Sequence, residues 1–111
     1  MSGTRGEALR RIEREIISEK AAALGRAGER LERMLAEAQS AATRLLAARD
    51  DDERTRHAQE YVALRAQALE ARLALLIQRE ALGLRRHATV DQQYPEPPII
   101  EALLRRNTSR N

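Results

Sequence analysis

Three arginines are the side chains in this sequence whose spacing most suggests chemistry. Arg65, Arg72 and Arg79 recur in steps of seven residues, which aligns them along one side of a helix. Guanidinium groups bind carboxylates and phosphates through paired hydrogen bonds, so this ladder is a candidate site for a small anion. A structural interpretation competes with it and is favoured, because arginine stems often flank helical seams and pair with glutamates of the facing helix. Such glutamates are available at Glu19, Glu29 and Glu32.

Other residue types that carry chemistry are missing or badly placed. The sequence has no cysteine, so it offers neither a thiolate ligand nor a cysteine nucleophile. His57 and His87 lie near opposite ends of one expected helix, about 45 Å apart, and one chain cannot place both on one metal ion. Gly25 and Gly28 fall in a stretch too short for a phosphate-binding loop, and their small size instead suits the close approach of another backbone. We therefore expect no metal, no cofactor and a non-catalytic role.

The charge pattern limits the possible partners. The net charge is +3, but the 20 basic and 17 acidic residues are interleaved and do not form the concentrated basic face that nucleic-acid binding needs. The longest aliphatic run, from Leu73 to Ile77, is far shorter than the roughly 20 residues that cross a bilayer, and the N-terminus lacks the apolar stretch of a secretory signal. We expect a cytoplasmic protein that binds neither membranes nor nucleic acid.

The pattern of small and apolar residues predicts an all-α fold. From Leu24 to Ala48 these residues recur in alternating steps of three and four, which is a heptad seam. Asp50 and the acidic residues after it suit the start of a second helix. Because the connection is so short, the two helices must lie antiparallel. The sequence thus predicts a long, coiled-coil-like helical hairpin in a single domain, residues 1–111.

The C-terminal part is expected to be irregular before a last short helix. Gly83 suits the end of the second helix, although that helix can also continue to His87. Each proline of the Pro95–Pro98 segment biases the residue before it away from helix. The expected elements are a first helix at about 5–49, a second at about 51–87, an extended segment at 88–98, a short helix at 99–106 and a frayed tail at 107–111.

The second helix carries two apolar stripes that lie roughly 120° apart by helical spacing. One contains Val62, Leu69, Leu73 and Leu76, and the other contains Tyr61, Leu64, Leu75 and Leu82. One neighbouring helix cannot cover both, so we expect the uncovered stripe to join a second copy, in a dimer with a four-helix core. Which stripe faces the second copy stays open from the sequence. The candidate residues for a partner-contacting or close-packing surface are Gly25, Gly28, Tyr61, Leu64, Leu75 and Leu82.

A set of short motifs is similar to those of a known family. They are Glu19-Lys20-Ala21, Leu24-Gly25-Arg26-Ala27-Gly28, Arg30-Leu31-Glu32, Gln78-Arg79-Glu80-Ala81 and Gly83-Leu84-Arg85, followed by Tyr94 and the proline-containing segment. In these residues the chain, from about Arg14 to Arg105, resembles a family of small bacterial helical proteins, mostly alphaproteobacterial, that is classed as a domain of unknown function. The chain departs from that family near Ala71 to Leu75, where a tryptophan is expected. The resemblance implies a helical fold of this organisation and no particular activity.

Together these observations favour a non-catalytic helical interaction or scaffold protein. One alternative is a helical protein or enzyme that binds a small anion through Arg65, Arg72 and Arg79. A second alternative is a basic protein that associates weakly with nucleic acid.

Overall fold

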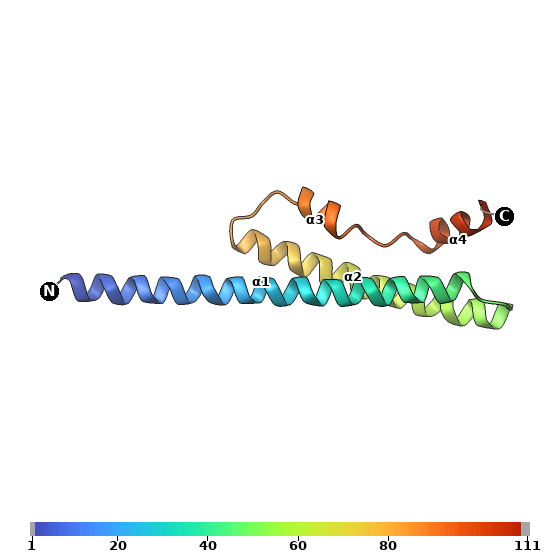
Figure 1. Cartoon of the computed structure of the whole chain (residues 1–111), viewed down its shortest axis with the longest axis horizontal. Coiled ribbons are helices and arrows are strands. Elements are labelled where there is room, and N and C mark those ends of the chain that lie inside the picture. Colours follow the sequence, from blue (N-terminus) through green and yellow to red (C-terminus); the bar gives the residue numbers. More distant parts are fainter. Residues whose placement is uncertain (1, 110–111) are drawn as a thin grey trace.

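The computed structural model describes residues 2–109, with side chains for residues 4–107. In that range the chain forms four helices and no strand: α1 (Ser2–Leu46), α2 (Asp51–Ala81), α3 (Ala88–Gln93) and α4 (Ile100–Ser109). The two long helices pack antiparallel as a hairpin, and the chain measures 77 × 23 × 13 Å (Figure 1). The all-α hairpin with a short C-terminal helix that the sequence predicts is confirmed.

The turn between the long helices is held by a pair of side-chain caps. The carboxylate of Asp50, the N-cap of α2, accepts from the backbone N–H of Glu53 at 2.8 Å. The carboxylate of Glu53 accepts from the backbone N–H of Arg49 at 2.9 Å. The first bond satisfies a donor that the helix start leaves free, and the second ties the residue before the N-cap to the first turn, which explains why α2 begins at residue 51 as expected. The first helix runs over 2–46 rather than 5–49, because the chain leaves the helix at Ala47 to reach this cap.

The second helix ends at Ala81, not at His87. Gly83 has a positive φ of 82°, which glycine adopts without a steric penalty. The backbone N–H of Gly83 donates to the carbonyl of Glu80 at 2.9 Å, and that of Leu84 donates to the carbonyl of Arg79 at 2.9 Å. This pair of hydrogen bonds is a Schellman cap, and it turns the chain back along the hairpin.

The returning chain forms what we call the strap, residues 84–107, which runs alongside the hairpin towards its turn (Figure 1). The expectation of an extended segment over 88–98 is wrong in its first half, because α3 occupies residues 88–93. The conformational restriction from Pro95 reaches only the residue before it, so α3 continues to Gln93 and stops at Tyr94. Val90 of α3 is 3% exposed, so burial of an apolar side chain supports this short helix.

The last helix also differs from its expected bounds. It begins at Ile100 and continues to Ser109, whereas the sequence predicted a helix over 99–106 and a frayed tail from 107. The tail expectation is therefore wrong for residues 107–109, and residues 110 and 111 lie outside the described residues. The apolar side of α4 contributes Leu103, which is buried against the hairpin.

Two small clusters of buried side chains form the core. The first joins α1 and α2 to α4 and contains Ala38, Ala41, Ala42, Leu45, Tyr61 and Leu103. The second joins α1 and α2 to α3 and contains Leu31, Ala71, Leu75 and Val90. Alanine at many inner positions lets the helix axes approach closely, so a core with few aromatic residues is still well packed. Both clusters lie where α2 accompanies α1, and the N-terminal part of α1 extends beyond them (Figure 1).

Candidate functional site

The arginine ladder holds the strap against α2. Each of its three guanidinium groups donates a hydrogen bond to a backbone carbonyl of the strap at 2.9 to 3.0 Å: Arg79 to Arg86, Arg72 to Tyr94 and Arg65 to Pro97. The hydroxyl of Tyr61 donates to the carbonyl of Pro98 in the same way. The structural interpretation of the ladder thus has a physical basis. Its expected partners are wrong, because the arginines bond to the strap and not to glutamates of α1.

The spacing of the ladder matches the spacing of the strap. Seven helical residues span about 10.5 Å at 1.5 Å per residue, and three extended residues span about 10 Å. Arg65 and Arg72 are seven residues apart, and the carbonyls that they bond, at Pro97 and Tyr94, are three residues apart in the extended part of the strap. Prolines supply no N–H donor, so a proline-rich segment offers carbonyls that need donors from elsewhere. Arginines spaced by seven residues, together with a proline-rich segment later in the chain, are a sequence signal for this contact. An analysis of helical periodicity alone misses it.

Arg72 is the best-enclosed member of the ladder. It is 9% exposed, and its guanidinium forms ion pairs with Asp91 and, at 3.6 Å, with Glu96. A buried charge needs such partners, because desolvation without compensation costs several kcal/mol. An anion at the ladder would have to displace these carboxylates and the strap carbonyls. Anion binding at Arg65, Arg72 and Arg79 stays an untested alternative.

The two tyrosines link the strap to both long helices. The hydroxyl of Tyr94 donates to a carboxylate oxygen of Glu32 on α1 at 2.6 Å. This bond raises the pKa of Tyr94 above its ordinary value, because ionisation would break it and place two negative charges together. Burial raises the pKa of the Tyr61 hydroxyl. Both side chains are therefore neutral donors at ordinary pH, and both belong to the architecture of the strap.

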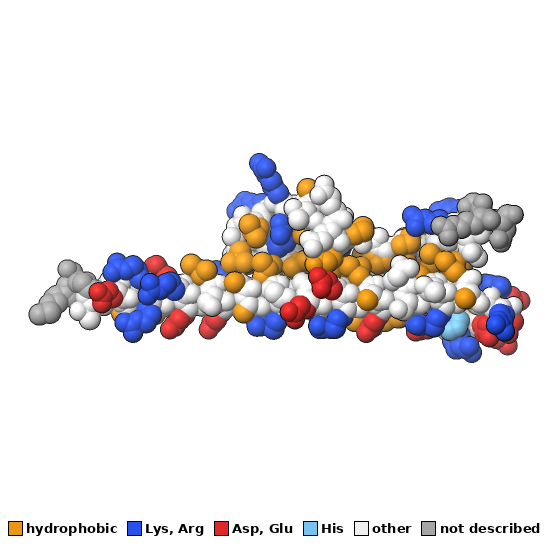
Figure 2. Space-filling view, in the orientation of Figure 1, with side chains coloured by type: hydrophobic (Ala, Val, Ile, Leu, Met, Phe, Trp, Pro, Cys, Tyr) orange, Lys and Arg blue, Asp and Glu red, His pale blue; other side chains and the backbone are white. Residues whose placement is uncertain are grey.

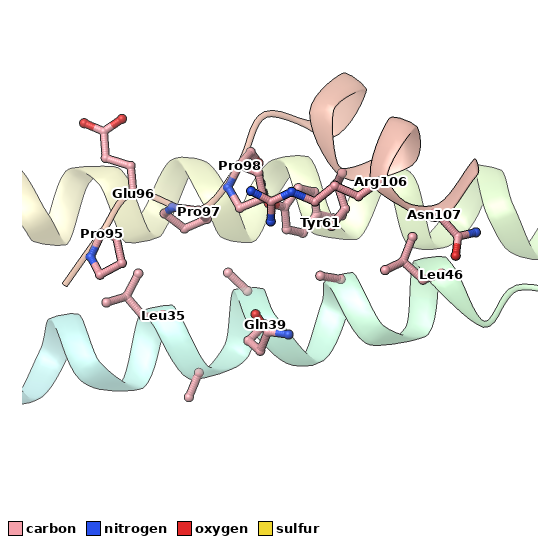
Figure 3. Close-up of a pocket in the computed structure, with 14 residues that line it drawn as sticks. Leu35, Gln39, Leu46, Tyr61, Pro95, Glu96, Pro97, Pro98, Arg106 and Asn107 are labelled. Atoms are coloured by element: carbon pink, nitrogen blue, oxygen red, sulfur yellow. Dashed lines mark hydrogen bonds between the residues drawn. The ribbon is translucent and has the colours of Figure 1, made fainter. Parts of the chain in front are cut away.

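A groove lies between α1 and the strap. It has a volume of about 760 Å³ and is lined by Leu35, Gln39 and Leu46 of α1, by the Pro95–Pro98 segment and by α4. In Figure 3 Leu35 of α1 lies beside Pro95 at one end of the groove, whereas Leu46 of α1 lies beside Asn107 of α4 at the other end, and Tyr61 of α2 lies behind the strap. Figure 2 shows hydrophobic side chains gathered in a band between α1 and the strap. Polar and apolar side chains share the lining, with Gln39, Glu96, Arg106 and Asn107 among the polar ones, and none of the arginines of the ladder lines it.

The two apolar stripes of α2 have different environments. Tyr61 and Leu75 are buried within the chain, at 1% and 5% exposure, and Leu64 and Leu82 are half-buried. Their stripe thus faces the interior and is closed to a partner. In the other predicted stripe Val62 and Leu73 are exposed and Leu69 is half-buried, but Leu76 packs against the second core cluster, so its place in an exposed stripe is wrong. We call the apolar line on this outer side of α2 the outer ridge: Val62, Ala66, Leu69, Leu73 and Ile77. Leu73 and Leu75 are two residues apart, which is about 160° around a helix, so the ridge points away from α1.

Gly25, Gly28 and the two histidines lie apart and do not come together as one site in the described part of the chain. A methyl group added at Gly25 or Gly28 would meet no neighbouring segment within 4 Å, so these glycines are not needed for packing inside the chain. His57 lies 3.5 Å from Glu60, and His87 lies 3.1 Å from Glu80. Within the described residues, no group of three acidic or histidine side chains is arranged to hold a metal ion.

Comparison of the chain with models of protein families, with curated proteins and with solved structures finds no match. The resemblance to a family of small bacterial helical proteins therefore stays an expectation, and function is inferred from the geometry of this chain. In the described part of the chain, every helix is too short or too polar to cross a lipid bilayer.

Proposed function

We propose that this chain is a non-catalytic helical scaffold protein that joins copies of itself through the outer ridge of α2. The exposure of the ridge carries the proposal: Val62 is 51% exposed, Leu73 58% and Ile77 56%. A helix on a protein surface normally presents charged side chains on the face turned from its neighbour. A continuous apolar line on that face is instead typical of a helix that packs on both sides.

The geometry of the ridge supports a second copy as its occupant. Its members are spaced by three or four residues, which is the spacing that packs one helix against another. The same spacing already packs α1 against α2 inside the hairpin. Two ridges in contact would put α2 of each copy at the centre and α1 of each copy outside, so the four helices would lie side by side in a row and not around one shared core. The sequence predicts a dimer without identifying its face, and the burial of Leu75 leaves the stripe with Leu73 as the available one.

Static light scattering on the purified chain at tens of micromolar tests this proposal. The wild type should have at least twice the mass of the 12.5 kDa chain, and Leu73→Glu should lower the average mass, because each ridge contact would then bury unpaired carboxylates. Gln67→Glu is the matched control, since it places the same charge at an exposed position of α2 outside the ridge. Circular dichroism verifies that both variants remain helical. A helical wild-type monomer, or equal masses for both variants, would contradict the proposal.

A further inference from the structure

The N-terminal part of α1 is a helix without a neighbour among the residues that the structure describes. We call residues 4–22 the arm, and every residue in it is exposed except Gly6, which is half-buried. Four large apolar side chains of the arm are exposed: Leu9 by 57%, Ile12 by 52%, Ile16 by 46% and Ile17 by 61%. A single helix in water gains little stability from helix propensity alone, and most helices in proteins are stabilised by packing an apolar face. The arm has that face but nothing in the described part of this chain covers it.

The apolar face of the arm continues the line with which α1 packs against α2. Proceeding backwards from the core in steps of three or four, the line contains Leu31, Ala27, Leu24, Lys20, Ile16, Glu13 and Leu9. Leu24 and Ala27 still pack against the core. Beyond them α2 has ended, and the line continues along the arm after two successive steps of four residues across Lys20, which interrupt the alternation of threes and fours. The arm is thus an extension of an established helix interface.

Two residues of opposite charge, Glu13 and Lys20, interrupt this line at positions that can pair between two copies. Glu13 and Lys20 are seven residues apart and lie within about 20° of each other around the helix. Their midpoint falls between Ile16 and Ile17, which is also within the exposed apolar group. A two-fold axis at that midpoint sets Glu13 of each copy level with Lys20 of the other. A parallel pairing would instead place Glu13 beside Glu13 and Lys20 beside Lys20, which like-charge repulsion disfavours.

We propose that the arms of two copies pair antiparallel about a two-fold axis between Ile16 and Ile17, with Glu13 and Lys20 forming ion pairs across the contact. This inference rests on the proposed function in that it assumes self-association, but it uses a different surface from the outer ridge. Each chain then has two separate self-complementary contacts. A chain with two such contacts assembles beyond the dimer, either into a closed tetramer or into an open row. The arm contact is the reason that a small chain can act as a scaffold.

Charge exchange in a Leu73→Glu background isolates the arm contact from the ridge. Leu73→Glu alone should be a dimer held by its arms. Adding Glu13→Lys should give monomers, because the introduced lysine would face Lys20 of the other copy, and adding Lys20→Glu should do the same with two glutamates. Each single exchange should raise the dissociation constant of the arm-paired dimer at least tenfold. Combining both exchanges in one chain should restore the dimer, and mixing the two single-exchange proteins should give a heterodimer. All these positions are exposed in the folded chain, so circular dichroism should show unchanged helicity.

The outcomes separate this inference from the proposed function. A monomeric Leu73→Glu protein would overturn arm pairing and leave the ridge contact standing. A wild-type mass that is unaffected by Leu73→Glu but lowered by Glu13→Lys would support arm pairing and contradict the ridge contact. Single exchanges without effect, or a double exchange that stays dissociated, would show that Glu13 and Lys20 do not face each other.

Spin-label distances test the antiparallel direction. Because the chain has no cysteine, one introduced cysteine carries one label. A label at Ser18 lies near the proposed two-fold axis and should give a short distance between copies. A label at Gln39 should lie about 70 Å from its symmetry mate, from 1.5 Å per residue along two antiparallel helices. Short distances at both positions would indicate parallel arms and contradict the proposal.

Discussion

Arg72 of α2 donates its Nε–H to the backbone carbonyl of Tyr94 at 3.0 Å, and this contact joins residues that are 22 positions apart in the chain. It fixes the point at which α3 ends and the extended part of the strap begins. The same guanidinium pairs with Asp91 and Glu96 on either side of that point. One side chain thus holds the middle of the strap through three separate groups.

Replacement of Arg72 should therefore destabilise the chain more than replacement of an exposed arginine would. A partly exposed ion pair contributes roughly 0 to 1 kcal/mol, but Arg72 is buried, and hydrogen bonds to charged groups contribute about 1.5 to 3 kcal/mol. We expect Arg72→Gln to lower the unfolding free energy by about 2 kcal/mol and to increase protease cleavage of the strap. Arg56→Gln, at an exposed position of the same helix, should change it by less than about 0.5 kcal/mol. Urea denaturation measures both, and similar values for the two variants would show that the strap is not held by Arg72.

Glutamate at Leu75 should have a different consequence from glutamate at Leu73. Leu75 is 5% exposed and packs in the cluster with Leu31 and Ala71. An unpaired carboxylate there costs more than about 4 kcal/mol once desolvation and lost packing are combined, which is a large share of the stability of a small domain. Leu75→Glu should lose most of its helical circular dichroism at 37 °C, whereas Leu73→Glu should retain it. Loss of helicity in both would mean that the outer ridge is covered within the chain.

Alanine substitutions at two glycines should change stability in opposite directions. Gly83 has a φ of 82°, where an L side chain costs about 1 to 2 kcal/mol, so Gly83→Ala should lower the melting temperature. Gly25 lies within α1 with open space around it, and alanine is favoured over glycine in a helix by about 1 kcal/mol. Gly25→Ala should therefore raise the melting temperature. A loss of stability in Gly25→Ala would reveal a neighbour at this surface, as a second copy that approaches Gly25 and Gly28 would provide.

Ionisation of the two tyrosines should lower the free energy of unfolding at high pH. The pKa values of Tyr61 and Tyr94 are both raised above the ordinary value of 10.0 in the folded chain. The folded state therefore retains protons that the unfolded state releases, so this contribution to stability is complete below pH 10 and is lost as the pH rises through the folded pKa values. Tyrosinate absorbance should appear at higher pH in buffer than in urea.

Replacement of Glu32, which accepts the hydrogen bond of Tyr94, tests the cause of the raised pKa of Tyr94. Glu32→Gln removes the negative charge beside the Tyr94 hydroxyl and should bring the pKa of Tyr94 down towards 10.0. Tyr61→Phe leaves Tyr94 as the only titrating tyrosine, which makes the change measurable. If Tyr94 in the folded chain titrates at or below the pH at which it titrates in urea, its hydrogen bond to Glu32 is contradicted.

Local sequence patterns predicted the elements that depend on neighbouring residues. The seam from Leu24 to Ala48 predicted α1, and Asp50 with the following acids predicted the start of α2, because helical periodicity and capping act over a few residues. The same local reasoning failed at residues 88–93. There the prolines indicated extended chain, and the burial of Val90 against α1 and α2 supports a helix instead.

The roles of Arg65, Arg72 and Arg79 and the identity of the exposed stripe were decided only by the tertiary structure. The sequence by itself determined that these arginines share one side of a helix and that α2 has two apolar stripes. It did not determine that the chain turns back at Gly83, and that return supplies the carbonyls for the arginines and covers Tyr61 while leaving Leu73 exposed. Helical periodicity specifies angles around one axis, whereas the choice of neighbour for each face depends on contacts between residues far apart in the chain.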